Sequence, residues 1–388
     1  MGRLFHWISA IFRLLGLQNV IILEAGRGTR ENTQAVFEEL LRRKAWEKYR
    51  FILVADRPAE LKHLVSRRVS VYQRPAYHAN YWAHFRLLWK KLRAVMILDE
   101  NVQIRKKLPD TVHILLTHGS PVKSVHDYYN CSPDTDYILS QSPFWAPINQ
   151  YELRVPPEKL VTLGFPRNDA LFDSAVSMEE LFGRAYRKVV VWFPTFRQHQ
   201  RYGKQTSISL PVLHDEAAAE QINAYAARYD VLLIVKPHPA QDLSAIQAME
   251  LDHLKFLYDD FFTAHGLTAH AFLAKTDAMI TDYSSIVFDY ILTGKPIALT
   301  FEDYSEYKER VGFAIDVDIL RSCSTMLDTA EDFERFFRDL AEGNDPLREK
   351  RDEVMRLTNT YLDGNSTRRV VDWLETLLAE RNQAPRHP

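Results

Sequence analysis

Short apolar runs rich in β-branched residues alternate with helical patterns along most of this chain. The strand-like runs are residues 19–25, 50–55, 69–73, 94–99, 112–118, 188–195, 231–237, 278–282 and 296–301. Continuous apolar strands joined by helices are typical of parallel sheets that carry helices on both faces. The pattern therefore predicts a doubly wound α/β fold.

Helical patterns separate these runs and follow the last of them. They cover residues 32–44, 77–93, 216–229, 285–294, 326–343 and 345–380. The pattern is interrupted between residues 171 and 187, so we expect two tandem Rossmann-like domains, over 1–175 and 186–388, with a cleft between them. Ligands of such sheets bind at the carboxyl ends of the strands, and the loops that follow the strands are where chemistry is expected.

Charge is distributed unevenly along the 388 residues. Residues 1–110 hold 21 Lys and Arg against 10 Asp and Glu, a formal charge of +11, whereas the whole chain carries −2. The near-neutral total argues against a nucleic-acid-binding protein. Aromatic side chains lie among the basic ones in residues 77–94, which favours an anionic membrane surface as a partner; a solvated basic face over a packed core is the alternative.

The amino-terminal segment and the cysteines limit where the protein works. Cys131 and Cys323 are too few for a disulfide scaffold or a Cys-based zinc site, so we expect a cytoplasmic protein. No apolar run approaches the roughly 18 residues that span a bilayer. Residues 1–17 have the pattern of a short amphipathic helix, which either packs on its own domain or lies in a membrane interface.

Two loops of the first half carry groups suited to a ligand. Residues 24–32 contain two glycines and an Asn but no GxGxxG fingerprint, so they form either a capped turn or a ligand loop. Residues 117–125 place His118 beside Gly119 and close to Lys123. An imidazole can accept a proton near neutral pH, and a lysine can neutralise a phosphate. The alternative is that backbone groups satisfy the His118 ring.

A third loop, residues 164–169, ends the first domain. Its Arg167 either binds a phosphate in bidentate fashion or pairs with Asp169 as part of a structural turn.

Loops of the second half add cations, hydroxyls and a second imidazole. The residues beyond the strand ends are Pro194, Thr195, Arg197, Lys236, Pro237, His238, Ser284 and Ser285. The two serines lie at the start of an expected helix, where free N–H groups bind anions, although one serine could simply be the N-cap. Asp289 could accept a bond from a ribose or polyol hydroxyl, or pair internally. Together the loops predict a site for a phosphorylated ligand with one histidine from each domain.

Several segments resemble a known family when they are taken together and in order. They are THGSPVKSV (117–125), GFPRND (164–169), FPTFR (193–197), VKPHP (235–239), TDYSSIVFDYILTGKPI (281–297) and YKERVGF (307–313). This series is similar to the bacterial CDP-glycerol glycerophosphotransferases, the primases and polymerases of teichoic acid synthesis. The resemblance implies a fold like that of GT-B glycosyltransferases and a peripheral position on the inner face of the cell membrane.

The resemblance also implies roles for individual residues. His118 would be the general base, and His238 a second essential histidine at the diphosphate. The implied donor contacts are Gly119, Ser120, Pro121, Val122, Arg167, Pro194, Thr195, Lys236 and Pro237, with Lys123, Arg197 and Asp282 as further candidates. Ser284 and Ser285 would hold phosphate, and Asp289 a ribose or polyol hydroxyl.

Three positions depart from the family pattern. Ser120 stands where the family commonly has Thr, which keeps the hydroxyl. Thr117 replaces an aromatic residue, which affects the acceptor side. Val311 interrupts the usual Arg-Gly pair, so the role of that loop does not carry over.

The implied reaction transfers glycerol phosphate from CDP-glycerol to a hydroxyl of a cell-surface glycan or polyol-phosphate acceptor on a lipid, with release of CMP. The rivals are a ribitol-phosphate transferase using CDP-ribitol, a nucleotide-sugar glycosyltransferase on the same scaffold, and a nonenzymatic nucleotide-binding protein. The sequence contains no HExxH motif, and no DxD in a plausible context, so it predicts no metal site and requires no cofactor. A Mg²⁺ ion held by a donor diphosphate would leave no trace in the sequence.

Overall fold

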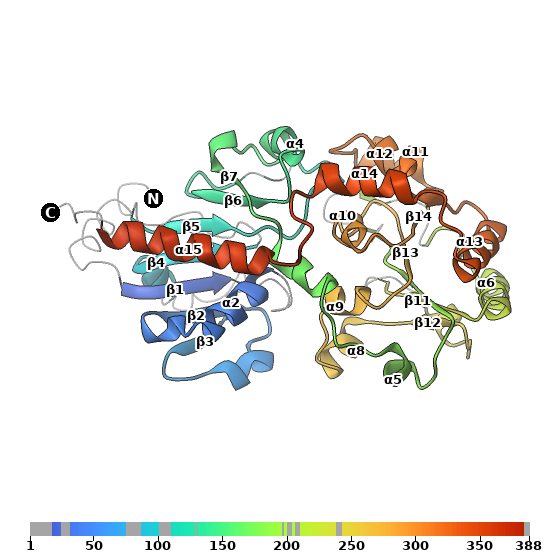
Figure 1. Cartoon of the computed structure of the whole chain (residues 1–388), viewed down its shortest axis with the longest axis horizontal. Coiled ribbons are helices and arrows are strands. Elements are labelled where there is room, and N and C mark those ends of the chain that lie inside the picture. The colour runs from blue at the N-terminus through green and yellow to red at the C-terminus, as the bar shows by residue number, and fades with distance from the viewer. Residues whose placement is uncertain are drawn as a thin grey trace. The chain divides into compact units, whose positions relative to one another are not determined.

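The computed structural model describes residues 18–24, 32–74, 87–100, 110–127, 129, 131–195, 198–199, 204–205, 210–237 and 243–383. The chain divides into two compact units (Figure 1). The first comprises Met1–His118, Asn130–Asp169 and Asp363–Pro388, and the second comprises Gly119–Tyr129 and Ala170–Leu362. The expected helix over residues 1–17 and most of the one over 77–93 lie outside the described residues.

A seven-stranded sheet forms the centre of the first unit. Its strands are β1 (Gln18–Glu24), β2 (Arg50–Ala55), β3 (Val69–Gln73), β4 (Ala94–Asp99), β5 (Val112–Leu115), β6 (Tyr137–Ser140) and β7 (Leu160–Thr162). Their spatial order is β3-β2-β1-β4-β5-β6-β7, and every neighbouring pair is parallel. The order reverses between β1 and β4, which is the Rossmann arrangement and marks where such sheets bind ligands.

The α-helices of this unit include α2 (Asn32–Arg42), α4 (Trp145–Glu152) and α15 (Ser366–Gln383). Figure 1 shows α15, in red, alongside β1 and α2. Val370 and Leu374 of α15 join one core with Ile21 of β1 and Leu40 of α2. The sequence had assigned this last helix to the second domain, but burial of its apolar side places it in the first unit.

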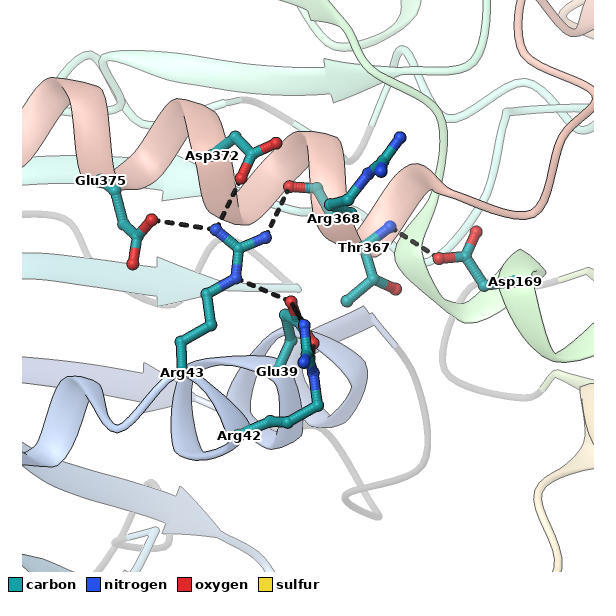
Figure 2. Close-up of polar contacts among 8 residues, drawn as sticks. All are labelled: Glu39, Arg42, Arg43, Asp169, Thr367, Arg368, Asp372 and Glu375. Atoms are coloured by element: carbon teal, nitrogen blue, oxygen red, sulfur yellow. Dashed lines mark hydrogen bonds and ion pairs between the residues drawn. The ribbon is translucent and has the colours of Figure 1, made fainter.

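Arg43, just after α2, connects that helix to α15 (Figure 2). Its guanidinium contacts Asp372 at 2.6 Å and Glu375 at 2.9 Å, both on α15, and its Nε atom lies 2.7 Å from Glu39. Arg42 contacts the other oxygen of Glu39 at 2.6 Å. These contacts hold the polar edges of the two helices together over their shared apolar core.

A six-stranded parallel sheet forms the centre of the second unit. Its strands are β8 (Lys188–Trp192), β11 (Val231–Val235), β12 (Leu254–Phe256), β13 (Ala278–Thr281), β14 (Ile297–Leu299) and β15 (Thr325–Met326). The spatial order β12-β11-β8-β13-β14-β15 again reverses once, between β8 and β13. A separate two-stranded antiparallel pair joins β9 (Gln198–His199) and β10 (Lys204–Gln205).

Helices surround this second sheet in the chain order expected for a doubly wound fold. They are α5 (Met178–Phe182), α6 (Glu216–Arg228), α7 (Ser244–Gln247), α8 (Asp259–Ala264), α9 (Ala269–Leu273), α10 (Val287–Tyr290), α11 (Tyr304–Arg310), α12 (Asp318–Ser322), α13 (Ala330–Glu342) and α14 (Arg348–Thr358). The two parallel sheets confirm the predicted α/β class. Among the described residues, no helix is both long enough and apolar enough to cross a bilayer.

Two expected elements are shorter or broken in the structure. The strand expected to reach residue 118 ends at Leu115, because Thr117 has a left-handed φ of 57° that no strand can contain. The helix expected over 345–380 is two helices, α14 and α15. Asn359, with a φ of −134° and a ψ of 120°, leaves helical geometry and ends α14. Gly364, with a φ of 63°, lies just before the start of α15.

Candidate functional site

His118 follows β5 at the carboxyl edge of the first sheet. The turn that carries it is unusual, because Thr117 has a φ of 57° and Gly119 a φ of 142°. The His118 side chain is exposed, and its Nδ1 atom lies 3.5 Å from the backbone oxygen of Glu100. With a proton on Nδ1 facing that carbonyl, Nε2 carries the lone pair that a general base needs.

Arg167 lies in a turn after β7, two strands along from β5 in the same sheet. Its side chain is buried, and its backbone N–H donates to Oδ1 of Asn32 at 3.0 Å. Asp169 does not pair with Arg167, because its two oxygens accept the backbone N–H groups of Ser366 at 2.8 Å and Thr367 at 2.7 Å. The turn is thus built against the amino terminus of α15.

The turn requires a glycine at position 164 for two reasons. Its φ is 79°, and a Cβ atom there would lie 2.4 Å from the hydroxyl oxygen of Ser366. In the GFPRND segment, Gly164 therefore approaches α15 closely and the Asp169 carboxylate caps it. Arg167 lies between these two residues in the sequence.

Buried acids at the ends of β1 and β4 were missed by the sequence analysis. Glu24, Asp99 and Glu100 lie where the strand order reverses and are almost fully buried. Burial raises the pKa of the Glu24 carboxyl, although an ion pair with Lys91 opposes the rise. A carboxylate directly after an apolar strand, as in VIILE and MILDE, was the signal that could have identified them.

The loop after His118 belongs to the second unit. Lys123 forms an antiparallel β-bridge with Phe313. Two backbone hydrogen bonds flank the bridge: the N–H of Ser124 donates to the carbonyl oxygen of Gly312 at 3.1 Å, and the N–H of Ala314 donates to that of Val122 at 2.9 Å. Ser120 and Val122 are buried. The predicted donor segment Gly119–Lys123 is therefore paired with the segment that contains the departure at Val311.

Three neighbouring strands of the second sheet bring further predicted residues together. The strands β11, β8 and β13 are adjacent in the sheet. Lys236 and Pro237 follow β11, Pro194 and Thr195 lie just beyond β8, and Asp282 with the two serines follows β13. The backbone N–H of Thr195 donates to both carboxylate oxygens of Asp282, at 3.0 and 2.9 Å. This bond lies at the reversal of strand order, so Asp282 joins the two loops at the point where such sheets bind ligands.

Lys236 has a carboxylate partner in the structure. Its Nζ atom lies 2.8 Å from Asp259, and the rings of Phe193 and Phe262 are within 6 Å, at 5.8 and 5.7 Å to their centroids. An ammonium group has three donors, so one ion pair leaves others for a phosphate.

The serine segment differs from its expected form. Helix α10 begins at Val287 and has four residues, followed by a 3₁₀ turn over Ile291–Thr293. Ser284 and Ser285 precede it, half exposed, and their carbonyls accept the first turn's N–H groups. The helix is therefore shorter than expected and begins after the serines, and their binding of an anion stays a prediction.

Asp289 adopts the internal one of its two expected arrangements. The carboxylate is 1% exposed, and its Oδ2 atom lies 3.1 Å from Nε2 of His270, which is also buried. His270, on α9, was not singled out by the sequence. His238 and Arg197 lie outside the described residues, and the roles of all these site residues stay predictions.

Comparison with known proteins places this arrangement in a family. The family model for CDP-glycerol:poly(glycerophosphate) glycerophosphotransferase matches residues 9–376. The chain belongs to this glycerophosphotransferase family. The match includes every loop described above, and it confirms the resemblance that the motifs indicated.

Individual members of this glycerophosphotransferase family are distant relatives of the chain. The teichoic acid poly(glycerol phosphate) polymerase of Bacillus spizizenii is 24% identical and covers 80% of this chain and 82% of its own. The teichoic acid glycerol-phosphate transferase of Staphylococcus aureus is 23% identical with the same coverage. A teichoic acid ribitol-phosphate primase of B. spizizenii is 22% identical over 73% of this chain and 75% of its own.

Solved structures agree on the fold. A variant of the wall teichoic acid polymerase TagF superposes with a TM-score of 0.72 at 16% identity, covering 97% of this chain and 94% of that one. A UDP-N-acetylglucosamine 2-epimerase from Listeria monocytogenes matches with a TM-score of 0.54 at 13% identity, over 94% and 97% of the two chains. Within the described residues, no group of three or more His, Cys, Asp or Glu side chains is arranged to hold a metal ion.

Proposed function

We propose that this chain transfers glycerol phosphate from CDP-glycerol to a hydroxyl of a lipid-linked cell-surface glycan or polyol-phosphate acceptor, and releases CMP. The observation that carries the proposal is the family match over residues 9–376, which spans all the loops at the carboxyl edges of both sheets. The exposed His118 and the cation Lys236 supply the chemistry that this transfer requires.

The proposed step forms one P–O bond and breaks another. His118 takes the proton of the acceptor hydroxyl, and the oxygen attacks the phosphorus that carries glycerol. The bond from that phosphorus to the bridging oxygen of the diphosphate breaks, and CMP leaves with the electron pair. Lys236, Arg167 and His238, with the hydroxyls of Ser284 and Ser285, would stabilise the charge that develops on CMP.

The acceptor and the location are parts of the same proposal. We infer that the protein works in the cytoplasm, peripherally on the inner face of the cell membrane, where a lipid-linked acceptor would be presented. The formal charge of +11 over residues 1–110 supports an attraction to anionic lipid. Binding to liposomes should then increase with anionic lipid content and decrease with salt.

A second donor is favoured by a specific observation. The ribitol-phosphate primase of B. spizizenii is about as similar to this chain as the glycerol-phosphate enzymes are, at 22% identity. CDP-ribitol is therefore the second candidate donor.

The released nucleotide tests the proposal. The chain is incubated with CDP-glycerol, CDP-ribitol or a UDP-sugar, each with a panel of lipid-linked acceptors, and the released nucleotides are separated. We expect acceptor-dependent CMP from CDP-glycerol. CMP from CDP-ribitol alone would transfer the assignment to ribitol, and UDP from the sugar donor would identify a glycosyltransferase.

A further inference from the structure

Asn32 connects the two predicted site loops of the first unit. It is the first residue of α2 and is 0% exposed. Its Nδ2 atom donates to the backbone oxygens of Leu116 at 3.1 Å and Thr117 at 2.9 Å, and its Oδ1 atom accepts from the N–H of Arg167 at 3.0 Å. The side chain of Asn32 thus connects the start of α2 to the residues that follow β5 and to the turn after β7.

The bond to Thr117 acts on the peptide group that carries His118. Thr117 is β-branched and has a φ of 57°, a left-handed conformation that such residues rarely adopt. The carbonyl that Asn32 holds belongs to the peptide bond between Thr117 and His118. The orientation of this peptide therefore constrains the direction in which the His118 side chain leaves the backbone.

A second contact ties the same helix end to His118. The N–H of Thr33 donates to the Glu100 carboxylate at 2.5 Å, and the backbone oxygen of Glu100 lies 3.5 Å from Nδ1 of His118. The amino end of α2 therefore reaches the His118 turn by two routes, through its first side chain and through Glu100.

We propose that Asn32 is a positioning residue, which holds His118 through Thr117 and holds Arg167 through its backbone N–H; this rests on the proposed function. The amide is suited to the task because it offers two donors and an acceptor on a short stem. Aspartate keeps an acceptor for Arg167 but loses both donors. Alanine loses every contact and leaves three backbone groups without this partner.

The two substitutions should separate the two effects. In CMP release from CDP-glycerol, Asn32→Asp should lower kcat by roughly tenfold or more, while KM changes less than about threefold, because a small displacement of a reacting group is costly. Asn32→Ala should lower kcat similarly and also raise KM by at least roughly threefold, because Arg167 is a proposed donor contact.

Matched variants distinguish positioning from loss of stability. Val36, one turn along α2, is fully buried and has no polar side-chain group to share in these contacts, so Val36→Ala should lower Tm and leave kcat and KM unchanged. Adding Thr117→Gly to Asn32→Ala should recover most of the lost kcat, because glycine adopts a left-handed φ without help. A purely structural role for Asn32 predicts no such recovery.

A readout without turnover completes the experiment. Histidine-selective NMR should show the His118 resonances displaced in Asn32→Ala and unchanged in Val36→Ala. The proposal is overturned if Asn32→Ala keeps kcat within about twofold of wild type, if Val36→Ala causes the same losses, or if the His118 resonances do not move. A wild-type chain that releases no CMP contradicts the proposed function instead, and the resonances then decide the role of Asn32 alone.

Discussion

Oδ2 of Asp169 lies 2.7 Å from the backbone nitrogen of Thr367, 198 positions later in the chain (Figure 2). The turn that carries Arg167 therefore caps the start of the helix that contains Thr367. The capped helix, α15, follows the residues of the second unit in the chain and packs in the core of the first unit. The last helix of the chain therefore supports a loop of the candidate site.

Removal of this cap should destabilise the protein. We expect Asp169→Ala to lower the free energy of unfolding by about 1–2 kcal/mol, because two N–H groups at the start of α15 lose their acceptor. Urea denaturation measures the change. The exposed Asp173, four residues along, is the matched control, and Asp173→Ala should change the value by less than about 0.5 kcal/mol. Equal effects from both variants would contradict the capping role.

Gly164 offers a test of the close approach to Ser366. Gly164→Ala should cost about 2–4 kcal/mol, from the left-handed φ of the new residue and from the contact of its Cβ with the Ser366 hydroxyl. Gly183→Ala is the control, since Gly183 has a φ of 74° and nothing within 4 Å of its Cβ position, so it should show only the backbone cost of about 1 kcal/mol. Ser366→Ala should rescue part of the difference.

The bond between Thr195 and Asp282 should affect activity and stability together. Asp282→Ala leaves a buried N–H without this acceptor, and we expect about 1–3 kcal/mol of lost stability along with a loss of CMP release. Asp277 accepts the N–H of Val189 at 2.8 Å at the opposite end of the same strand pair. Asp277→Ala should therefore lose stability but keep its rate of CMP release; a matching loss of rate would refute a local role for Asp282.

His118→Ala should reduce turnover by about 10²–10⁴-fold, the usual contribution of a general base. Tm should change little, because the side chain is exposed. The exposed His265 serves as the control substitution. His238→Ala should cause a comparable loss. A near wild-type rate in either variant would remove the role assigned to that histidine.

The free energy of unfolding should depend on pH through the Glu39 carboxylate. The hydrogen bond from Arg42 lowers its pKa below the ordinary value of 4.5, and Arg43 adds to the effect. A lowered folded-state pKa stabilises the protein above pH 4.5, and this contribution is lost as the pH falls through the folded-state value.

Urea titrations at a series of pH values measure this effect. Glu39→Gln should be less stable than wild type by about 0.5–1 kcal/mol at pH 7, and the two should converge as the pH falls through the lowered folded-state pKa of Glu39. Glu38→Gln, at a carboxylate on the same helix that accepts from the neutral Gln34, is the matched control. A gap between wild type and Glu39→Gln that persists at low pH would argue against the ion pair.

The class of fold could be read from the sequence because the strands are buried on both faces. Runs such as RFILVA and AVMILD are apolar without alternation, and they became β2 and β4 with the expected bounds. The loops that carry His118, Arg167, Thr195, Lys236 and the serines could also be located, because in a parallel sheet they follow strand ends.

Only the tertiary structure decided which of these groups hold one another in place. The partners of Asp169 are backbone N–H groups far along the chain, those of Asn32 are backbone atoms of two distant loops, and Asp289 faces His270. Local patterns report periodicity and burial within a segment, which is why they predicted the strands and their order along the chain. They do not encode contacts between segments that are distant in the chain, because such contacts exist only once both sheets and α15 have packed.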